Sequence, residues 1–127
     1  MDFILDTHAF IWFINGETLP ATVVEKIEDI NNNCFISIAS IWEIAIKTSL
    51  GKLTLKTRFD MVEDALYNNN IEILPITFDQ LKQLTKLPYH HNDPFDRLII
   101  SQAIAQEMIV LSMDAKFKLY DVNVQWS

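Results

Sequence analysis

Four acidic residues that are far apart in the chain each lie beside apolar sequence, and together they have the chemistry of a metal site. They are Asp6, Glu43, Asp96 and Asp114. Charged side chains are rarely kept next to core-forming sequence unless they are paired or bind a cation. If the fold brings these carboxylates into one cleft, their repulsion is large, and a divalent cation is the simplest way to relieve it.

Two of the four acids end apolar runs, as residues at the ends of buried strands do. Asp6 follows residues 3–5, and Asp114 follows residues 109–113. In open parallel sheets functional groups collect at the carboxyl ends of strands, and these two strands could be neighbours at the sheet centre. A helix is also expected after each acid, so helix capping and metal binding are both open for each of them. We expect Ser112 to support Asp114 by a hydrogen bond or by holding a metal-bound water.

Glu43 is the only acidic residue in the long, mostly apolar segment 37–47. The alternative to a ligand is an ion pair with Lys47, four residues further along the helix, and that alternative predicts an exposed Glu43. Because the neighbours of Glu43 are mostly apolar and leave little helix surface for solvent, we interpret it as part of the metal site.

The segment Asp93-Pro94-Phe95-Asp96 predicts a helix start. Asp93 suits the N-cap, Pro94 the first helical position, and Asp96 the third position of a capping box with Asp in place of Glu. The short side chain of Asp96 reaches back to the cap poorly. We therefore assign Asp93 to capping and Asp96 to the metal site, and the two could share both duties.

The histidines and the single cysteine do not predict a zinc site. His90 and His91 are adjacent, so they cannot face one ion as a pair four residues apart would, and Cys34 lies in a predicted strand. His8 is expected at the surface in a first helical turn. The candidate ligands are therefore all carboxylates, and such a set favours a hard cation, Mg²⁺ or Mn²⁺.

The elements that must position these residues alternate between strand and helix with short connections, which predicts an α/β fold with a mostly parallel sheet. Apolar runs predict strands at 2–6, 34–38, 71–76 and 109–112 and an edge strand at 122–125. Helical spacing and Pro, Gly and Asn punctuation predict helices at 8–14, about 20–30, from after residue 38 to 50, 59–67, 77–87, about 94–106 and 114–119.

Length and composition predict one domain over residues 1–127 with a substantial core, since half of the residues are hydrophobic. A start without a basic flank and the lack of a membrane-length apolar run lead us to expect a cytoplasmic protein with no membrane segment. The net charge of −7 argues against sequence-blind binding of nucleic acid by a basic surface. It does not exclude nucleic acid as a substrate.

Six stretches of the chain resemble the PIN-domain family, and more closely the VapC-type toxins of bacterial toxin–antitoxin pairs. They are residues 5–9, 40–47, 51–53, 74–76, 91–103 and 111–114. The resemblance implies a three-layer α/β/α sandwich around a parallel sheet of four to five strands. It implies a catalytic and metal-binding set of Asp6, Glu43, Asp96 and Asp114. Thr7, Asp93 and Ser112 are expected to support this set. The resemblance also implies Mg²⁺- or Mn²⁺-dependent cleavage of RNA, a cognate antitoxin partner and a homodimer.

Two other classes of protein are alternatives. A catalytically idle interaction domain would keep the fold and bind a partner through apolar helices; residues 10–13 are apolar almost all round, although complete burial would explain them equally well. A haloacid-dehalogenase-like phosphatase would carry a second Asp two positions after Asp6, where His8 stands. A receiver domain would carry a lysine after its last central strand, and residues 122–126 supply none. The sequence therefore disfavours both magnesium-dependent folds.

Overall fold

The computed structural model describes residues 1–127 and has one sheet of five parallel strands at its centre. The strands are β1 (Asp2–Leu5), β2 (Asn33–Ser37), β3 (Ile71–Leu74), β4 (Ile109–Leu111) and β5 (Val124–Gln125). Their order across the sheet is β3-β2-β1-β4-β5, so β1 lies in the middle and β4 is its neighbour. The expected α/β fold is confirmed, and the sheet is parallel throughout.

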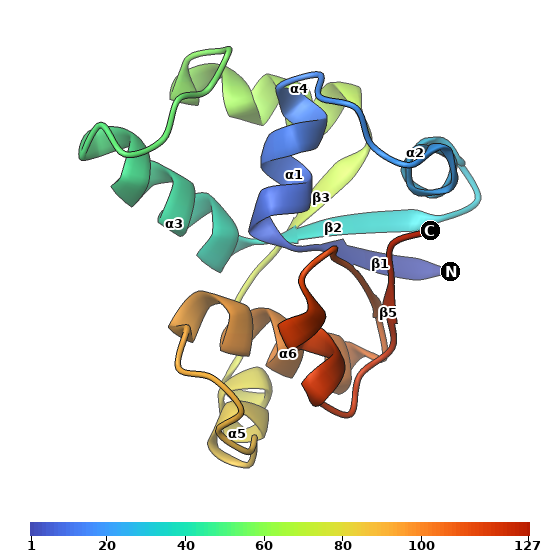
Figure 1. Ribbon diagram of the computed structural model, residues 1–127, viewed down its shortest axis with the longest axis vertical. Helices are drawn as coiled ribbons and strands as arrows, with labels where there is room; N and C mark the ends of the chain where they lie inside the picture. Colours follow the sequence, from blue (N-terminus) through green and yellow to red (C-terminus); the bar gives the residue numbers. More distant parts are fainter.

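Helices cover both faces of the sheet, which makes the three layers visible in Figure 1. They are α1 (Thr7–Ile14), α2 (Ala21–Glu28), α3 (Ile38–Ser49), α4 (Val62–Asn68), α5 (Phe78–Thr85) and α6 (Pro94–Gln106), with 3-10 turns η1 (Phe59–Met61) and η2 (Ala115–Leu119). One face is covered by α1, α2 and α4, and the other by α5, α6 and η2. Helix α3 runs outward from the end of β2, between α1 and α6.

The central strand β1 sends side chains into two separate cores. Phe3 and Leu5 pack with Phe10 of α1 in one cluster, and Ile4 packs with Ile100 of α6 in the other. A strand buried on both faces must be apolar at every position, which explains the continuous run in the sequence. The first polar side chain after this run therefore stands at the carboxyl edge of the sheet.

Several elements are shorter than the sequence predicts, and turn chemistry explains most of the differences. The strand predicted at 2–6 ends at Leu5 because Asp6 is the N-cap of α1. The strand predicted at 71–76 ends at Leu74, before Pro75, which has no N–H to donate to a neighbouring strand. The helix predicted at 59–67 begins with η1 and continues as α4.

The apolar residues of helix α1 are not all buried, and they do not leave one whole side of the helix exposed either. Phe10 and Ile11 are buried, whereas Trp12 and Phe13 are only partly buried. Trp12 packs against Trp126 near the end of the chain, with the ring centroids 5.9 Å apart. The apolar stretch thus serves the core with one side and leaves part of its aromatic surface accessible.

No helix in the structure is both long enough and apolar enough to cross a lipid bilayer.

Candidate active site

The pairing of β1 with β4 brings the ends of two distant apolar runs together. Leu5 pairs with Leu111, so the next residues, Asp6 and Ser112, leave the sheet side by side. The Ser112 hydroxyl donates to Asp6 Oδ2 at 2.5 Å and accepts the backbone N–H of Asp114 at 3.0 Å. From the sequence, Ser112 is expected to support Asp114. In the structure this one hydroxyl connects Asp6 with the segment that carries Asp114.

Asp6 is a buried carboxylate with two different hydrogen-bond partners. It is 4% exposed, and its Oδ1 accepts the N–H of Ala9 at 2.7 Å as the N-cap of α1. Burial raises the pKa of Asp6, while the hydrogen bonds from Ser112 and Ala9 and the nearby His8 oppose that rise. The alternatives of cap and site residue are compatible here, because each carboxylate oxygen has more than one lone pair.

Two further acids cap helices. Asp114 Oδ1 accepts the N–H of Lys116 at 2.9 Å at the start of η2, and its other oxygen has no hydrogen bond within the protein. Asp93 Oδ1 accepts the N–H groups of Phe95 and Asp96, at 2.9 and 3.2 Å, at the start of α6. Asp93 caps as expected, but Asp96 makes no bond back to it, so the capping box does not close.

Glu43 is buried, and it also forms the ion pair with Lys47 that the sequence offered as the alternative to a buried ligand. Its side chain is 7% exposed, and its Oε2 lies 2.7 Å from Nζ of Lys47, whose side chain is 42% exposed. The expectation that such a pair requires an exposed Glu43 is wrong, because a lysine stem can reach inward while much of it stays in solvent. The helix also has more solvent-facing surface here than expected, since Trp42 is 61% exposed.

Thr7 joins the two helices that begin at this edge of the sheet. It is 3% exposed, and its hydroxyl donates to Ser40 Oγ at 2.9 Å. Because Thr7 starts α1 and Ser40 lies in the first turn of α3, this bond holds the turn before Glu43 against the helix that Asp6 caps.

Asp96 senses the other acids directly. Its pKa is raised from 3.8 to about 7, chiefly by burial and then by the charges of Asp93, Asp6, Glu43 and Asp114. A charge acts on a pKa in this way only from nearby. Asp6, Glu43 and Asp114 are therefore all within electrostatic reach of Asp96, although the four acids come from four different segments.

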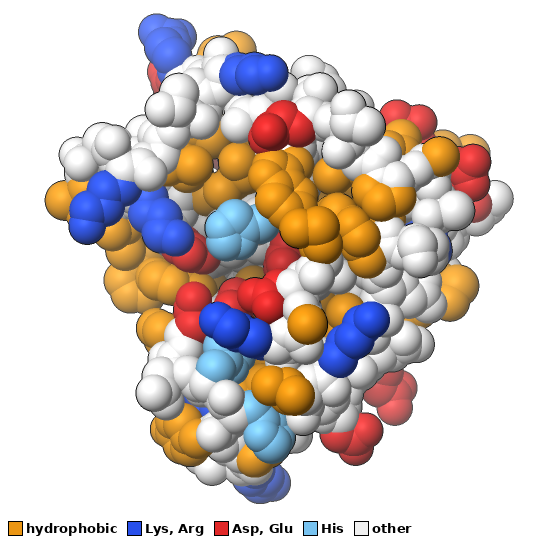
Figure 2. All heavy atoms as spheres, in the orientation of Figure 1, with side chains coloured by type: hydrophobic (Ala, Val, Ile, Leu, Met, Phe, Trp, Pro, Cys, Tyr) orange, Lys and Arg blue, Asp and Glu red, His pale blue; other side chains and the backbone are white.

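Two of these carboxylates, those of Asp6 and Asp114, line an open hollow. Figure 2 shows acidic side chains gathered in the hollowed centre of this face, with histidine and other basic (Lys or Arg) side chains at its edges. The hollow has a volume of about 270 Å³ and is lined by Asp6, His8, Trp12, Met113 and Asp114. His8 is exposed there, as expected.

The donor set fits a hard divalent cation by its chemistry. No three acidic, histidine or cysteine side chains are already arranged as a metal cage. The available donors are nevertheless carboxylate oxygens, which Mg²⁺ and Mn²⁺ prefer. The charges of Asp93, Asp6, Glu43 and Asp114 add to burial in raising the pKa of Asp96, and a cation would neutralise these charges.

One residue beside this cluster was not found from the sequence. His91 Nε2 lies 3.4 Å from Asp96 Oδ2, and His91 Nδ1 lies 2.7 Å from the hydroxyl of Tyr120. The sequence pattern gives His91 no role beyond that of a zinc ligand beside His90, which the adjacent positions of the two residues exclude. The available signal was its place in the short loop before the helix that carries Asp96.

Comparisons with known proteins agree with this architecture. The family model described as PIN domain matches residues 3–123. Among solved structures, VapBC2 from Rickettsia felis bound to a promoter DNA fragment has a TM-score of 0.78 at 19% identity, covering 100% of both chains. DNA-bound VapBC from Salmonella typhimurium has a TM-score of 0.75 at 18% identity, covering 100% of this chain and 99% of that one. The PIN domain endonuclease Utp24 has a TM-score of 0.53 at 15% identity, covering 92% of this chain and 74% of that one.

A search of the curated proteins returns no match. The structural likenesses, at these identities, establish a shared fold. The family match extends over nearly the whole chain, from Phe3 in β1 to Asn123, just before β5. On this ground the chain belongs to the PIN domain family.

Proposed function

We propose that this protein is a metal-dependent endoribonuclease and the toxin of a bacterial toxin–antitoxin pair. The observation that carries the proposal is the coupling of Asp96 to Asp6, Glu43 and Asp114 at the carboxyl edge of a parallel sheet. A purely structural edge would have no reason to gather like charges beside a core, since each buried carboxylate is costly. Membership of the PIN domain family and the likeness to VapBC and to an endonuclease point the same way.

Each acid has a distinct part in the proposed chemistry. Asp6 and Asp96 would hold the principal ion, Glu43 would bind it or orient the attacking water, and Asp114 would hold a second or weaker ion. A bound Mg²⁺ or Mn²⁺ supplies a lower pKa for the attacking water and neutralises charge on the phosphate. Without a cation, this set of carboxylates would repel the phosphodiester.

The remaining groups of the chain hold these acids in place. The Ser112 hydroxyl fixes one oxygen of Asp6, and the Ala9 N–H fixes the other, so the carboxylate cannot rotate freely. Lys47 offsets the charge of Glu43 while that side chain is buried. The donors are thus oriented before any ligand arrives, which is how binding sites reduce the cost of ordering.

The proposed antitoxin partner is supported by accessible apolar surface outside the hollow that Asp6 and Asp114 line. A second hollow of about 360 Å³ is lined mostly by apolar side chains, namely Ile41, Phe59, Val62, Leu66 and Ile73, together with Asp60 and Glu63. Apolar hollows of this kind suit the apolar face of a partner helix. The similar VapBC and FitAB structures carry the names of toxin–antitoxin pairs. A homodimer is part of the same proposal and rests on the family resemblance.

Purified protein tests the proposed activity directly. Labelled RNA and DNA of the same sequence are incubated with Mg²⁺ or Mn²⁺, with and without a chelator. We expect cleavage of RNA that stops on chelation and is lost in Asp6→Asn, which changes one charge at nearly constant shape. Equal cleavage by the wild type and Asp6→Asn would identify a contaminating nuclease and defeat the proposal. Growth inhibition in cells that survives Asp6→Asn would favour an interaction domain without catalysis.

A further inference from the structure

A buried chain of polar side chains runs from Arg97 through Tyr120 and His91 to Asp96. Arg97 and Tyr120 are each 4% exposed, and the His91 side chain is 10% exposed. Arg97 Nη1 donates to the Tyr120 hydroxyl at 3.3 Å, and that hydroxyl lies 2.7 Å from His91 Nδ1. His91 Nε2 then faces Asp96 Oδ2 at 3.4 Å. The chain therefore ends on one of the four acids of the candidate active site.

The far end of this chain is fixed by Arg97. Its guanidinium donates to the carbonyl oxygens of Pro88 and Leu87, at 2.8 and 3.5 Å, and lies 3.8 Å above the ring of Tyr89. These contacts hold the Nη1–H that points at Tyr120. Arginine stays charged under all ordinary conditions, so this group can only donate.

Counting hydrogen bonds at Tyr120 decides which nitrogen of His91 carries the proton. A tyrosine hydroxyl has one proton to donate and two lone pairs that accept. The Arg97 Nη1–H and the backbone N–H of His91, at 3.3 and 3.2 Å, occupy the two lone pairs. The third neighbour, His91 Nδ1 at 2.7 Å, must then accept the phenolic proton. In the neutral imidazole the remaining proton is on Nε2, the atom that faces Asp96.

The His91 Nε2–H is a buried donor whose hydrogen bond is not complete. It has no hydrogen-bond partner in the structure, and its distance of 3.4 Å from Asp96 Oδ2 exceeds the usual N–H···O range. Leaving a buried donor unsatisfied is unfavourable, because the group has lost its hydrogen bonds to water. Rotation of a carboxylate about its last torsion is soft, so a small turn of Asp96 would complete the bond.

We propose that His91 is the positioning residue of Asp96. Its Nε2–H, selected by Tyr120 and Arg97, donates to Asp96 Oδ2 and fixes the orientation in which that carboxylate binds a divalent cation. The inference rests on the proposed function in taking Asp96 as a metal ligand. Groups that orient a ligand in this way typically contribute about 10- to 100-fold to metal affinity. Arg97 and Tyr120 act through His91 and do not touch the ion.

The tautomer of His91 can be tested without metal or RNA. We expect the imidazole ¹⁵N spectrum of the metal-free protein, recorded where the ring is neutral, to show the His91 proton on Nε2. Tyr120→Phe removes the phenolic donor, so the Nδ1–H form should gain population in that variant. A wild-type spectrum with the proton on Nδ1 would overturn the inference, because no donor would then face Asp96.

Calorimetric titration with Mn²⁺ tests the consequence for binding. We expect His91→Ala to weaken Mn²⁺ binding about 10- to 100-fold. His91→Gln should recover most of the affinity, because its amide N–H can take the place of Nε2–H. The matched control is His90→Ala, which removes an exposed ring 4.9 Å from that of Tyr120 and should leave the affinity unchanged. Thermal melts of all variants show whether each one is folded.

The outcomes separate the two proposals. Wild-type affinity in His91→Ala, or equal weakening in His91→Ala and His91→Gln, would overturn the role of His91 while leaving the metal site intact. A wild-type protein that binds no Mn²⁺ would overturn the proposed function, and the role of His91 with it.

Discussion

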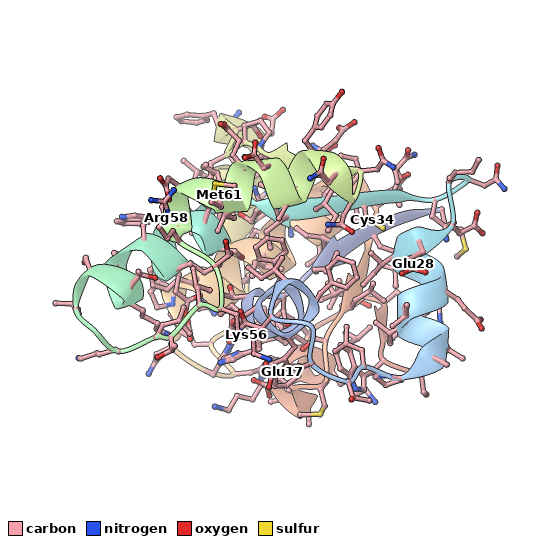
Figure 3. All side chains as sticks on the ribbon, turned by 90° about the horizontal axis from the view of Figure 1, so that it is seen from above. Glu17, Glu28, Cys34, Lys56, Arg58 and Met61 are labelled. Atoms are coloured by element: carbon pink, nitrogen blue, oxygen red, sulfur yellow. The ribbon has the colours of Figure 1, made fainter.

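The two ends of the parallel sheet each carry a hollow, and the larger one is at the end opposite to the acid cluster. At the amino-terminal ends of β2 and β3 a hollow of about 440 Å³ is lined largely by asparagines and acidic residues. Glu28 and Cys34, two of its lining residues, are labelled in Figure 3. The hollow at the carboxyl ends of β1 and β4 has only about 270 Å³. Volume alone would select the end opposite to the proposed site.

The two hollows differ in how their polar groups are satisfied. In the larger one, asparagine amides bond to nearby groups: Asn33 Nδ2 donates to Asp2 at 2.8 Å, and Asn69 Nδ2 donates to a carbonyl of its own helix at 2.8 Å. Burial raises the pKa of the Cys34 thiol to about 11, so it is uncharged at neutral pH. Beside the smaller hollow, burial and then the charges of Asp93, Asp6, Glu43 and Asp114 raise the pKa of Asp96 to about 7. Like charges held together beside the core mark a functional site more reliably than space does.

The largest expected effect is on RNA cleavage, when one carboxylate is removed at the acid-lined end of the sheet and the result is compared with the same change at the other end. Asp114→Asn should reduce RNA cleavage by about 10³-fold, which corresponds to several kcal/mol of transition-state stabilisation from the cation it would hold. Glu72→Gln removes a charge from the larger hollow and should change cleavage less than about twofold. Initial rates at saturating Mg²⁺ measure both. Similar losses in the two variants would erase the distinction between the two ends.

The next effect is on stability in the absence of metal. Because the pKa of Asp96 is raised from 3.8 to about 7, the folded protein binds more protons than the unfolded chain between these values. The free energy of unfolding should therefore fall as pH rises from about 4 to about 7 and level off above. Asp96→Asn should remove most of that fall and stabilise the metal-free protein at pH 8 by about 1–3 kcal/mol.

Urea unfolding at pH 5 and pH 8 in the presence of a chelator measures this dependence. Adding Mg²⁺ at pH 8 should restore stability to the wild type and do little for Asp96→Asn, because the ion binds the charged carboxylate. If the free energies of unfolding of the wild type and Asp96→Asn depend on pH in the same way, then the titration of Asp96 does not cause the predicted fall.

Ser112 gives a smaller effect that is confined to the acidic end. Ser112→Ala deprives Asp6 of a donor and the Asp114 N–H of an acceptor, which should cost about 2 kcal/mol of stability and weaken Mn²⁺ binding. Ser101→Ala is the matched control, because that buried hydroxyl donates only to the Arg97 carbonyl at 3.0 Å. Urea unfolding and calorimetry compare them. Unchanged Mn²⁺ affinity in Ser112→Ala would remove Ser112 from the site.

The smallest effect belongs to the other end of the sheet. Asn70 lines the larger hollow and has a φ of +55°, in the left-handed region that glycine adopts without strain. Asn70→Gly should change stability by less than about 1 kcal/mol and leave RNA cleavage and Mn²⁺ binding as they are. A change in either activity would show that the two ends are coupled.

The sequence predicted the fold from its apolar runs and from the Pro, Gly and Asn residues that end its helices and strands. Asp6 and Asp114 could be placed at one edge because the carboxyl ends of parallel strands share an edge, whatever the details of the turns. Strand ends were less predictable, since Asp6 and Pro75 stop strands by capping and by lacking an N–H. These are local choices that the apolar pattern does not record.

Contacts between residues far apart in the chain limited how much of the candidate site could be predicted from the sequence. Glu43 was judged from its sequence neighbours, and its burial beside Lys47 depends on helices that pack from elsewhere. The contact of His91 with Tyr120 spans 29 residues, and no periodicity in the sequence reports it. Residues that carry charge could thus be found from the sequence, and those that orient them required the structure.

An anomalous diffraction map from crystals grown with Mn²⁺ tests the central claim most directly. We expect a peak at the carboxyl edge of the sheet, about 2.0–2.6 Å from oxygens of Asp6 and Asp96. A saturated crystal with no peak at these carboxylates, or with its peak in the asparagine-lined hollow, would contradict it.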